Sequence, residues 1–525
     1  MKAPARSLAG GLAGLGIAAL VAFLAFYQLD DYPTTWFDEG SHLHVPETLV
    51  RYGVYADRSS DGFRYFGPTL GVGPTVMLPI AGVFKLFGIG LVQGRLVIAL
   101  YLIAALYLLW RLASAVNDRG FAGLALVLVI SSPAVAIVET GRQVLGEVPA
   151  LCFLLCAFCV WFSAWEGSWL RLTAAGLLLG LSAITKYQNF LVLVPTLALA
   201  ALANALYYRT TRLRTFVWPG LLVVTVFGLW QAILVVYLGP QTSAENFTAL
   251  REATAGAAAV FSADAMKRAV RQLFSFSTYG GSLVLALPYA VSCSLSRSRR
   301  SQQWALLLSF VVVNLAWYVF ASIGWPRYAF AGLALASLFV ARFYLDALRA
   351  LTEGAALARE SGAREDVTRL RGLQAALVTW AALTVLPAVA VTVRPIMRPP
   401  ENAPAVISAY LNREVPTSAV IETWEPELGA LTEHNYHYPP ARLLNVAVRH
   451  IWLGGPSPRE QYHALENERP GYVVVGGFAR WVGLYSTEVL SKHYVLVTKI
   501  GDYELYRRRD IPKSDEQHSA RRGQA

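Results

Sequence analysis

Two adjacent carboxylates, Asp38 and Glu39, follow an aromatic pair in the segment WFDEG, shortly after a long apolar run. Acidic residues favour the first turn of a helix, so a purely structural role at a helix start is the simplest interpretation of the pair. A positioned carboxylate can also accept a proton from an attacking hydroxyl group. Which role applies depends on the charged groups that the fold brings to the pair.

Isolated ionisable residues recur in the later short turns between apolar segments. They are Glu139, Arg142, Glu147, Lys186 and Arg327. Charged groups this close to apolar spans usually face a cavity and serve a function. A carboxylate pair and several cations at one face would suit an anionic substrate held near a base. The elements between these turns must therefore bring them to one side.

The composition indicates a membrane protein. Of the 525 residues, 55% are hydrophobic and 15% are charged, with a mean hydropathy of +0.44. Soluble domains carry more charge and less apolar content. The sequence predicts an all-α polytopic membrane protein with about eleven spans, each long enough or nearly long enough to cross a hydrocarbon core of roughly 30 Å. The predicted spans are 8–28, 91–112, 120–138, 147–165, 172–186, 190–207, 216–238, 281–296, 303–322, 328–345 and 373–393.

The distribution of arginine decides the topology. The apolar segment 70–88 is interrupted by Gly71, Gly73, Pro74, Pro79 and Lys85, so it could either span the membrane or lie in the interface. If it lies in the interface and the N-terminus is cytoplasmic, the arginine clusters at 209–214 and 297–300 fall on the cytoplasmic side, as the positive-inside rule requires. We therefore expect an interfacial helix in the first external loop. The segments predicted outside are then 29–90, 139–147, 186–189, 239–280, 324–327 and everything from Arg394 onward.

The chain after the last span changes character. Alternating runs such as SAVIETW, GYVVVGG, HYVLVTKI and YELYRRR predict strands, and APAVISAYLNREV predicts a helix. We expect a transmembrane domain over 1–395, a small external α/β domain over 396–510 and a disordered tail over 511–525. The net charge of +11 is explained by cytoplasmic loops, so no nucleic-acid partner is expected.

Four segments of the chain resemble segments of the GT-C membrane glycosyltransferases, and they occur in the same order as in those enzymes. They are WFDEG, the apolar GPTVMLPIAGVFKLFG followed by a span that opens with GRL, the turn GRQVLGEVPAL, and GLSAITKYQNFLVLVP. The resemblance is greatest to the branch that contains protein O-mannosyltransferases and lipid A aminoarabinose transferases. It covers roughly residues 20–210, with a weaker match at GWPRYAFAGLALAS.

The resemblance implies a glycosyltransferase, hexosyl or pentosyl, that takes a sugar from a polyprenyl-phosphate donor (in some branches a pyrophosphate) and transfers it with inversion to an acceptor hydroxyl outside the cytoplasm. We expect it in a bacterial inner membrane. The resemblance also implies that Asp38 is the catalytic carboxylate, with Glu39 beside it, and that Lys186 meets the donor phosphate. The chemistry of the residues agrees, because a sugar phosphate needs a base for the attacking hydroxyl and cations such as Lys186, Arg142 or Arg327 for the leaving phosphate. The expected partners are the lipid-linked sugar donor, membrane lipids, and a lipid, glycan or protein acceptor.

The chain also departs from this branch. Some relatives carry a basic residue just before the Pro-rich segment of the first loop, where this chain has GVGP; Arg64 or Lys85 could substitute. His42 and His44 follow the acidic pair and could join it around a divalent cation, although a polar loop role is the simpler interpretation and much of this branch works without a metal. Glu147 could equally be a helix-start carboxylate. His434 and His437 could line an acceptor surface or pack in a loop.

Three alternative functions compete with this prediction. A transporter or flippase of a lipid-linked sugar would share the spans and cations, but such proteins often contain repeated halves, and none is visible here. A ligase-type polysaccharide transferase would be expected to use arginine and histidine in a late external loop. The loop 239–280 holds Arg251, Arg268 and Arg271 but no histidine. A structural membrane protein with a sensor domain would leave the ordered charged turns unexplained.

Overall fold

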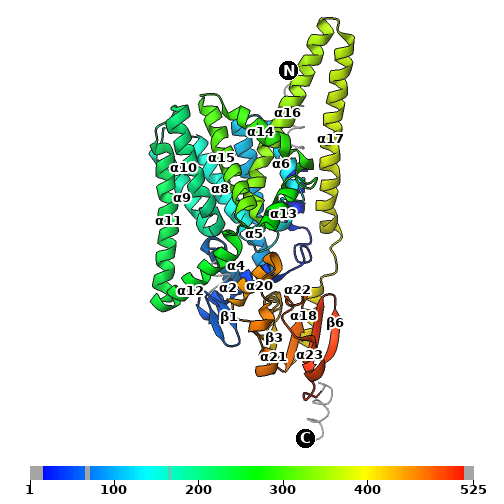
Figure 1. Ribbon diagram of the computed structural model, residues 1–525. Helices are drawn as coiled ribbons and strands as arrows, with labels where there is room; N and C mark the ends of the chain where they lie inside the picture. Colours follow the sequence, from blue (N-terminus) through cyan, green and yellow to red (C-terminus); the bar gives the residue numbers. More distant parts are fainter. Residues whose placement is uncertain (1–15, 66–70, 164, 166, 513–525) are drawn as a thin grey trace.

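The protein is described by a computed structural model, which covers residues 16–65, 71–163, 165 and 167–512 (Figure 1). Among these described residues, six helices are long and apolar enough to cross a membrane: α5 (Leu91–Val116), α10 with its π-helical end (Tyr187–Tyr208), α11 (Arg214–Leu238), α15 (Arg299–Phe320), the 3-10 turn η4 with α16 (Pro326–Glu360) and α17 (Arg364–Met397). Five shorter apolar helices occupy the other predicted spans: Gly16–Phe26, α6 (Arg119–Ser131), α8 (Glu147–Ser163), α9 (Trp169–Thr185) and α14 (Leu283–Ser294). Within the described residues, the expected polytopic helical fold is confirmed. Residues 8–15 of the first predicted span lie outside them.

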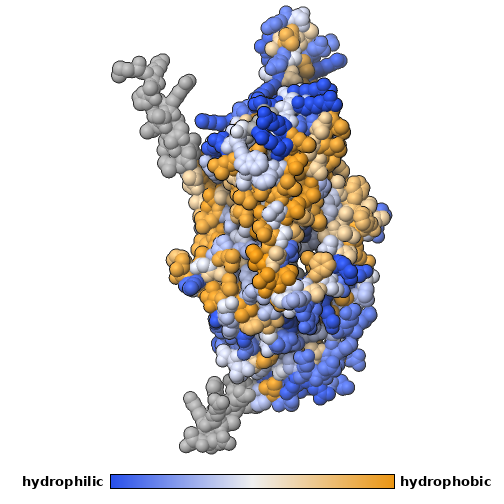
Figure 2. Space-filling model, turned by 90° about the vertical axis from the view of Figure 1, so that its left-hand side faces the viewer, coloured by the Kyte–Doolittle hydropathy of each residue, from blue (hydrophilic) through white to orange (hydrophobic). Residues whose placement is uncertain are grey.

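The exterior and interior of the bundle differ as a membrane setting requires. Figure 2 shows an apolar band between a hydrophilic tip and a hydrophilic base. Helix α16 lies in the interior, and every residue from 329 to 341 is buried. Small residues in this stretch let neighbouring helices approach closely. In α11 and α17, by contrast, only 11% of the apolar window is buried, so both helices present their apolar side chains outward.

The segment 346–372, between the last two predicted spans, is a helical hairpin. Helices α16 and α17 continue beyond the bundle and meet at a turn around Gly362, so the hairpin projects at the upper right of Figure 1. The charged sequence of this region is compatible with exposed helix, and Arg342 pairs with Asp346 one turn along.

The first predicted external loop is largely helical. It contains α2 (Phe37–Tyr52), a short hairpin of β1 (Asp57–Ser59) and β2 (Gly62–Arg64), and α4 (Pro74–Phe87). Helix α4 has 14 residues, which is about 21 Å of helix, and it packs against α2 of the same loop at the end of the bundle (Figure 1). This agrees with the predicted interfacial segment 70–88, whose first residue lies outside the described residues. A second helical loop holds α12 (Pro240–Ala253), the π-helical η2 (Thr254–Ala258) and α13 (Ala263–Leu273).

The C-terminal region folds around a five-stranded sheet of order β4-β3-β5-β7-β6. Strands β4, β3 and β5 are parallel, and β7 and β6 join antiparallel. The strands are β3 (Val420–Thr423), β4 (Asn435–His437), β5 (Tyr472–Val475), β6 (Tyr494–Ile500) and β7 (Tyr503–Arg508), and the helices around them include α18 (Ala403–Glu414), α19 (Glu427–Leu431), α20 (Leu443–Leu453), α21 (Ala464–Asn467), α22 (Gly477–Val482) and α23 (Thr487–His493). All four predicted strand runs and the predicted helix are confirmed. Of the predicted tail 511–525, residues 513–525 lie outside the described residues.

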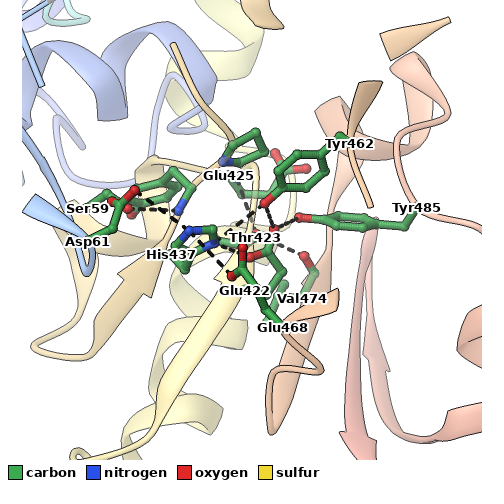
Figure 3. Close-up of polar contacts among 12 residues, drawn as sticks. Ser59, Asp61, Glu422, Thr423, Glu425, His437, Tyr462, Glu468, Val474 and Tyr485 are labelled. Carbon is green, nitrogen blue, oxygen red and sulfur yellow. Dashed lines mark hydrogen bonds and ion pairs between the residues drawn. The ribbon is translucent and has the colours of Figure 1, made fainter. Parts of the chain in front are cut away.

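The sheet is attached to the first loop by backbone and buried polar contacts. Ser60 N–H donates to the Tyr436 carbonyl at 2.7 Å, and Arg64 donates to the carbonyls of Tyr438 and Pro439. Figure 3 shows the adjoining network, in which His437 lies between Glu422 of β3 and Asp61 of the hairpin, 3.9 Å from the latter. The hydroxyls of Tyr462 and Tyr485 each donate to Glu422 at 2.7 Å. These contacts join the C-terminal sheet to the first loop beside α2.

Candidate active site at one end of the bundle

A cavity of about 500 Å³ opens at the end of the bundle that faces the sheet. All six segments that the sequence analysis places outside the cytoplasm contribute to its wall. The contributing residues include Asp38 and His42, Glu147, Lys186, Leu250 and Ala253, Trp325 and Arg327, and Leu444. The predicted number and order of the spans therefore place these six segments at the same end of the bundle. This holds whichever side of the membrane that end faces.

Asp38 and Glu147 enter the cavity wall beside the same cation. Asp38 lies in the first turn of α2, whose N-cap residue is Trp36. Its Oδ2 accepts a hydrogen bond of 2.5 Å from Nη1 of Arg327. Nη2 of Arg327 donates to Oε1 of Glu147 at 2.8 Å. The Asp38 side chain keeps 26% of its surface exposed, so it can meet a ligand while it is paired.

Lys186 completes this cluster from the other side of Glu147. Its Nζ lies 2.9 Å from the same Oε1 atom that Arg327 contacts. The second oxygen of Glu147, Oε2, is buried with no hydrogen-bond partner among the described residues. One carboxylate oxygen thus holds two cations side by side. Because an ammonium has three N–H donors and a guanidinium has five, both cations keep donor capacity for a bound anion.

The position of Lys186 follows from a break between two helices. Lys186 is extended, with φ −141° and ψ 109°, and it ends α9 and begins α10. The chain around Val72 pairs with this break, and Gly73 N–H donates to the Thr185 carbonyl at 3.1 Å. A Cβ at Gly73 would lie 1.7 Å from the Ile184 carbonyl oxygen. This close approach leaves no room for a side chain at Gly73, whereas a Cβ at Gly71 would meet no atom within 4 Å.

Glu39 does not line the cavity, although it is adjacent to Asp38. It is fully buried, and its carboxylate receives two hydrogen bonds from the buried Arg95, at 2.8 and 2.6 Å. Arg95 also donates to the carbonyls of Leu29 and Pro33. Val144 N–H donates to Glu39 as well, at 3.0 Å. Glu39 therefore fixes the chain before α2 onto the bundle, and we assign it a positioning role.

Arg142 is likewise placed away from the cavity. Its guanidinium is fully buried and donates to the carbonyls of Leu24, Tyr27, Gln28 and Tyr32. These bonds hold the end of the first helix. The structure therefore gives Arg142 no route to a donor phosphate, because a guanidinium enclosed by backbone carbonyls is already fully used. Glu139 is not among the residues of the cavity wall either.

The remaining predicted residues are spread over several places. Arg64 bonds Asp61 and two carbonyls of the soluble domain, and Lys85 is exposed on α4. His42 does line the cavity, and its Nδ1 lies 2.7 Å from the Val144 carbonyl. Burial lowers the pKa of His42 to about 4, so it is neutral at physiological pH and adds no cation.

The geometry gives little support to a divalent cation at the acidic pair. Asp38 faces Arg327 and Glu39 faces Arg95, so the two carboxylates do not converge on one point. The described part of the chain contains no group of three or more His, Cys, Asp or Glu residues arranged to hold a metal. The ion remains an untested prediction.

The comparisons with known proteins agree with this architecture. The sequence model of the dolichyl-phosphate-mannose-protein mannosyltransferase family matches residues 72–233. No curated protein sequence matches the chain significantly. Among solved structures, ArnT from Cupriavidus metallidurans in the apo state aligns over 96% of this chain and 98% of its own, with 12% identity and a TM-score of 0.63. The same protein bound to undecaprenyl phosphate aligns with 13% identity and a TM-score of 0.60, over 95% of this chain and 98% of that one. The chain has the GT-C fold.

The oligosaccharyltransferase of Archaeoglobus fulgidus is a further GT-C structure that this chain resembles. Tethered to an acceptor peptide, it aligns over 95% of this chain and 74% of its own, with 14% identity and a TM-score of 0.54. The resemblance predicted from the sequence is thus confirmed at the level of fold and family model.

Three residues that shape this site were not identified in the sequence analysis. The rings of Trp36 and Trp325 lie 5.6 and 4.7 Å from the guanidinium carbon of Arg327, which holds that cation between two aromatic faces. Arg95 holds Glu39. A signal for each was present, since these residues belong to the quoted segments WFDEG, GWPR and GRL. The sequence does not show which residues these three side chains contact.

Proposed function

We propose that this protein is an inverting glycosyltransferase that moves a sugar from a polyprenyl-phosphate donor to an acceptor hydroxyl. The observation that carries the proposal is the cluster of Asp38, Arg327, Glu147 and Lys186 in the wall of one cavity. It combines a partly exposed carboxylate with two cations that keep free donors. The structural relatives include ArnT bound to undecaprenyl phosphate and AglB in complex with an inhibitory peptide and a dolichol-phosphate, which is consistent with such a donor.

The cavity suits an amphipathic donor. Lys186 and Arg327 supply positive charge at one place in its wall, where a phosphate would sit. Phe190, Leu191 and Phe227 supply apolar surface nearby, where the first isoprene units of the lipid would lie. A soluble nucleotide sugar has no lipid chain that could pack against this apolar wall beside the membrane.

The reaction follows from the positions of these groups. The Asp38 carboxylate accepts the proton of the acceptor hydroxyl, and the oxygen uses its electron pair to bond the anomeric carbon. The bond from that carbon to the phosphate oxygen breaks, and its electron pair leaves with the polyprenyl phosphate. Arg327 and Lys186 stabilise the charge that builds on the phosphate. One in-line displacement of this kind inverts the anomeric centre, and it needs no acid because the phosphate is already a good leaving group.

We further propose that the cavity opens on the outer side of a bacterial inner membrane, with the N-terminus in the cytoplasm. The basic loops lie together at another part of the bundle, where the Arg297 guanidinium carbon is 5.1 Å from the Tyr207 ring and Arg300 donates to the Val116 carbonyl. Placing them inside satisfies the positive-inside rule and leaves the cavity and the sheet outside. A tag-accessibility map that finds the 297–300 loop outside would overturn this orientation.

The proposed activity is tested by transfer with the purified full-length protein. Undecaprenyl-phosphate-linked hexoses and pentoses are supplied as donors, and released undecaprenyl phosphate is measured with an extract of envelope glycans, lipids or peptides as acceptor. We expect release that depends on both donor and acceptor and that is lost in Asp38→Asn. ATP-independent movement of intact donor across proteoliposomes without release would instead favour a flippase and contradict the proposal.

A further inference from the structure

A second cavity, of about 600 Å³, adjoins the first on the side of the sheet. The two cavities share part of their walls, and the shared residues are Phe37, Asp38, Trp325, Leu444 and Val448. Asp38 is therefore reached from both sides. A base at such a boundary is placed to take a proton from a group in one cavity while a leaving group departs into the other.

The charges of the two cavities are opposite in kind. The first contains Lys186 and Arg327. The second is lined by the carboxyl groups of Asp38, Glu401, Glu425, Glu427 and Asp502, and among the described residues of its wall there is no Lys, Arg or His. A phosphate or carboxylate group entering the second cavity would meet the carboxylates of Asp38, Glu401 and Asp502 and no donor cation, which costs free energy.

Tryptophan rings form much of the wall of the second cavity. Trp36, Trp325, Trp452 and Trp481 line it, and Phe478 adds a further ring. Successive rings lie close together: the centroids of Trp36 and Trp325 are 6.3 Å apart, those of Trp325 and Trp452 are 6.1 Å apart, and those of Trp452 and Trp481 are 6.4 Å apart. Trp481 is 60% exposed, which is unusual for so large an apolar side chain in a soluble domain. The aromatic surface runs from this exposed ring to the wall beside Asp38.

Two buried carboxyl groups stand against this aromatic surface. Glu425 and Glu427 are only 1% and 2% exposed. Glu425 accepts from Ala479 N–H at 2.9 Å, and Oε1 of Glu427 accepts from the Tyr503 hydroxyl at 2.7 Å. The side chains of Glu425 and Glu427 also lie within hydrogen-bond reach of each other, so the two carboxyl groups can share a proton.

The surroundings of the two carboxyl groups favour their protonated forms. Burial and the neighbouring Glu427 raise the pKa of Glu425 well above its usual range, and burial raises the pKa of Glu427 to about 7. The pair can therefore donate one hydrogen bond and accept others, which is what a sugar hydroxyl needs. A cation-binding site would instead be favoured by two ionised carboxylates.

The loop that carries the pair is held against the helix of Asp38. A Cβ at Gly40 would lie 2.2 Å from the backbone nitrogen of Glu427, so α2 and the start of α19 touch. His44 of α2 bonds the Pro426 carbonyl with Nε2 at 2.8 Å. A ligand bound to the pair is thereby fixed relative to Asp38.

We propose that the second cavity binds the acceptor of the transferase as an uncharged sugar, which stacks on the tryptophan wall and hydrogen-bonds to the Glu425–Glu427 pair. The inference rests on the proposed function and adds the class of acceptor. The apolar face of a sugar ring packs on aromatic rings, while its hydroxyls both donate and accept. The acceptor hydroxyl points to Asp38, gives it the proton, and forms the bond to the anomeric carbon as the polyprenyl phosphate departs into the first cavity.

The test measures binding to the purified full-length protein in nanodiscs. Intrinsic tryptophan fluorescence is titrated with the neutral disaccharides mannobiose and cellobiose, with mannose 6-phosphate and glucose 6-phosphate, with glucosamine, and with a Ser/Thr-rich peptide. We expect saturable binding of at least one neutral disaccharide and at least tenfold weaker binding of the phosphorylated sugars. Preferential binding of a phosphosugar, the amine or the peptide overturns the inference, as does the absence of binding by every neutral sugar at millimolar concentration.

Variants localise the binding. Trp481→Ala should weaken disaccharide binding about tenfold, since an aromatic contact contributes about 0.5–1.5 kcal/mol beyond its buried area. Trp380→Ala, which removes a tryptophan of α17 that is 45% exposed and does not line this cavity, should leave it unchanged. Glu425→Gln tests the contribution of the Glu425–Glu427 pair to disaccharide binding. Asp502→Asn tests the contribution of an exposed side chain of the cavity wall, where the substitution should not disturb folding. Unchanged affinity in Trp481→Ala and Asp502→Asn together overturns the assignment of the site.

The same samples separate this inference from the proposed function. Binding of undecaprenyl phosphate is measured in parallel by native mass spectrometry. If neutral sugars bind and undecaprenyl phosphate does not, the donor proposal fails while the sugar site stands. If undecaprenyl phosphate binds and supports transfer but only a charged acceptor is bound, the proposed function stands and this inference fails.

Discussion

Two clusters of buried charge lie on either side of the start of α2, and they are built differently. In one, Arg95 and Arg142 are completely enclosed, and their donors are used by Glu39 and by backbone carbonyls. In the other, Arg327 and Lys186 share one oxygen of Glu147 at the wall of a cavity, and Asp38 remains partly exposed. The first cluster has the properties of a clamp, and the second has those of a binding site.

The comparison shows that charge near a membrane span does not by itself indicate function. All four cations stand close to apolar helices at the same end of the bundle. They are distinguished by whether their hydrogen bonds are satisfied within the protein and whether a cavity reaches them. The predictions below test this distinction, beginning with the change expected to have the largest effect.

Asp38→Asn should reduce the rate of sugar transfer by about 10²–10⁴-fold, because an amide cannot accept the proton that the carboxylate takes. The change keeps the size of the side chain and one acceptor for Arg327. Transfer from a polyprenyl-phosphate sugar is measured at saturating donor, with the thermal unfolding of the purified protein as the control. A folded Asp38→Asn protein with full activity would remove the base from the mechanism.

Glu39→Ala should lower the free energy of unfolding by about 3–5 kcal/mol, because Arg95 would remain buried without its counter-ion. The apparent melting temperature in detergent measures the loss. The double variant Glu39→Met with Arg95→Met provides the control, since removal of both charges should recover much of the stability. If Glu39→Ala melts normally and loses only transfer, then Glu39 belongs to the site and the division into clamp and site is wrong.

Lys186→Met should weaken the binding of undecaprenyl phosphate by roughly 10–100-fold, which corresponds to the loss of one or two charge-assisted hydrogen bonds. Lys85→Met is the matched control, because Lys85 is an exposed lysine on a helix of the same region. Native mass spectrometry of both variants with undecaprenyl phosphate gives the affinities. Equal weakening in the two variants would mean that the lipid phosphate is attracted by general surface charge.

The sequence predicts which turns meet but not which side chains meet in them. The spacing of the spans places residues 38, 147, 186 and 327 at one end, and the structure puts all four in one cavity. It does not separate Asp38 from Glu39, because successive helical residues point about 100° apart and the sequence alone does not say which of them faces the bundle. The same limit applies to Arg142, whose side chain turns back to carbonyls more than a hundred residues earlier in the chain.

The features that the sequence analysis missed depend on contacts between residues that lie far apart in the sequence. Strand β4 has only three residues and is defined by its pairing with β3. The Glu425–Glu427 pair belongs to the wall beside Asp38 only because α19 packs on α2 near Gly40. No local pattern around residues 425–427 announces a contact with residue 40. By contrast, the runs SAVIETW and GYVVVGG carry their own strand signal, and both fold as predicted.

The smallest predicted effect concerns pH and the contact between α2 and the sheet. Nδ1 of His44 lies 2.7 Å from Asp57, and its Nε2 lies 2.8 Å from the Pro426 carbonyl. Both partners are acceptors, so both ring nitrogens donate, which requires the protonated ring. Burial alone would lower the pKa of His44, but Asp57 outweighs it and raises the pKa above its ordinary value.

A raised pKa means that the folded protein holds this proton more tightly than the unfolded chain. The stabilisation is therefore complete below about pH 6.5, the ordinary pKa of histidine, and is lost as the pH rises through the folded value. The melting temperature should fall over that range in the wild-type protein and should fall less in His44→Gln. Glu427, whose pKa is raised from 4.5 to about 7, contributes a decrease of the same sign but mainly at lower pH, between those two values. Glu427→Gln should therefore flatten the acidic part of the profile and His44→Gln the alkaline part; identical profiles in both variants would contradict the assignment of His44 as the charged contact between α2 and the loop that carries the acid pair.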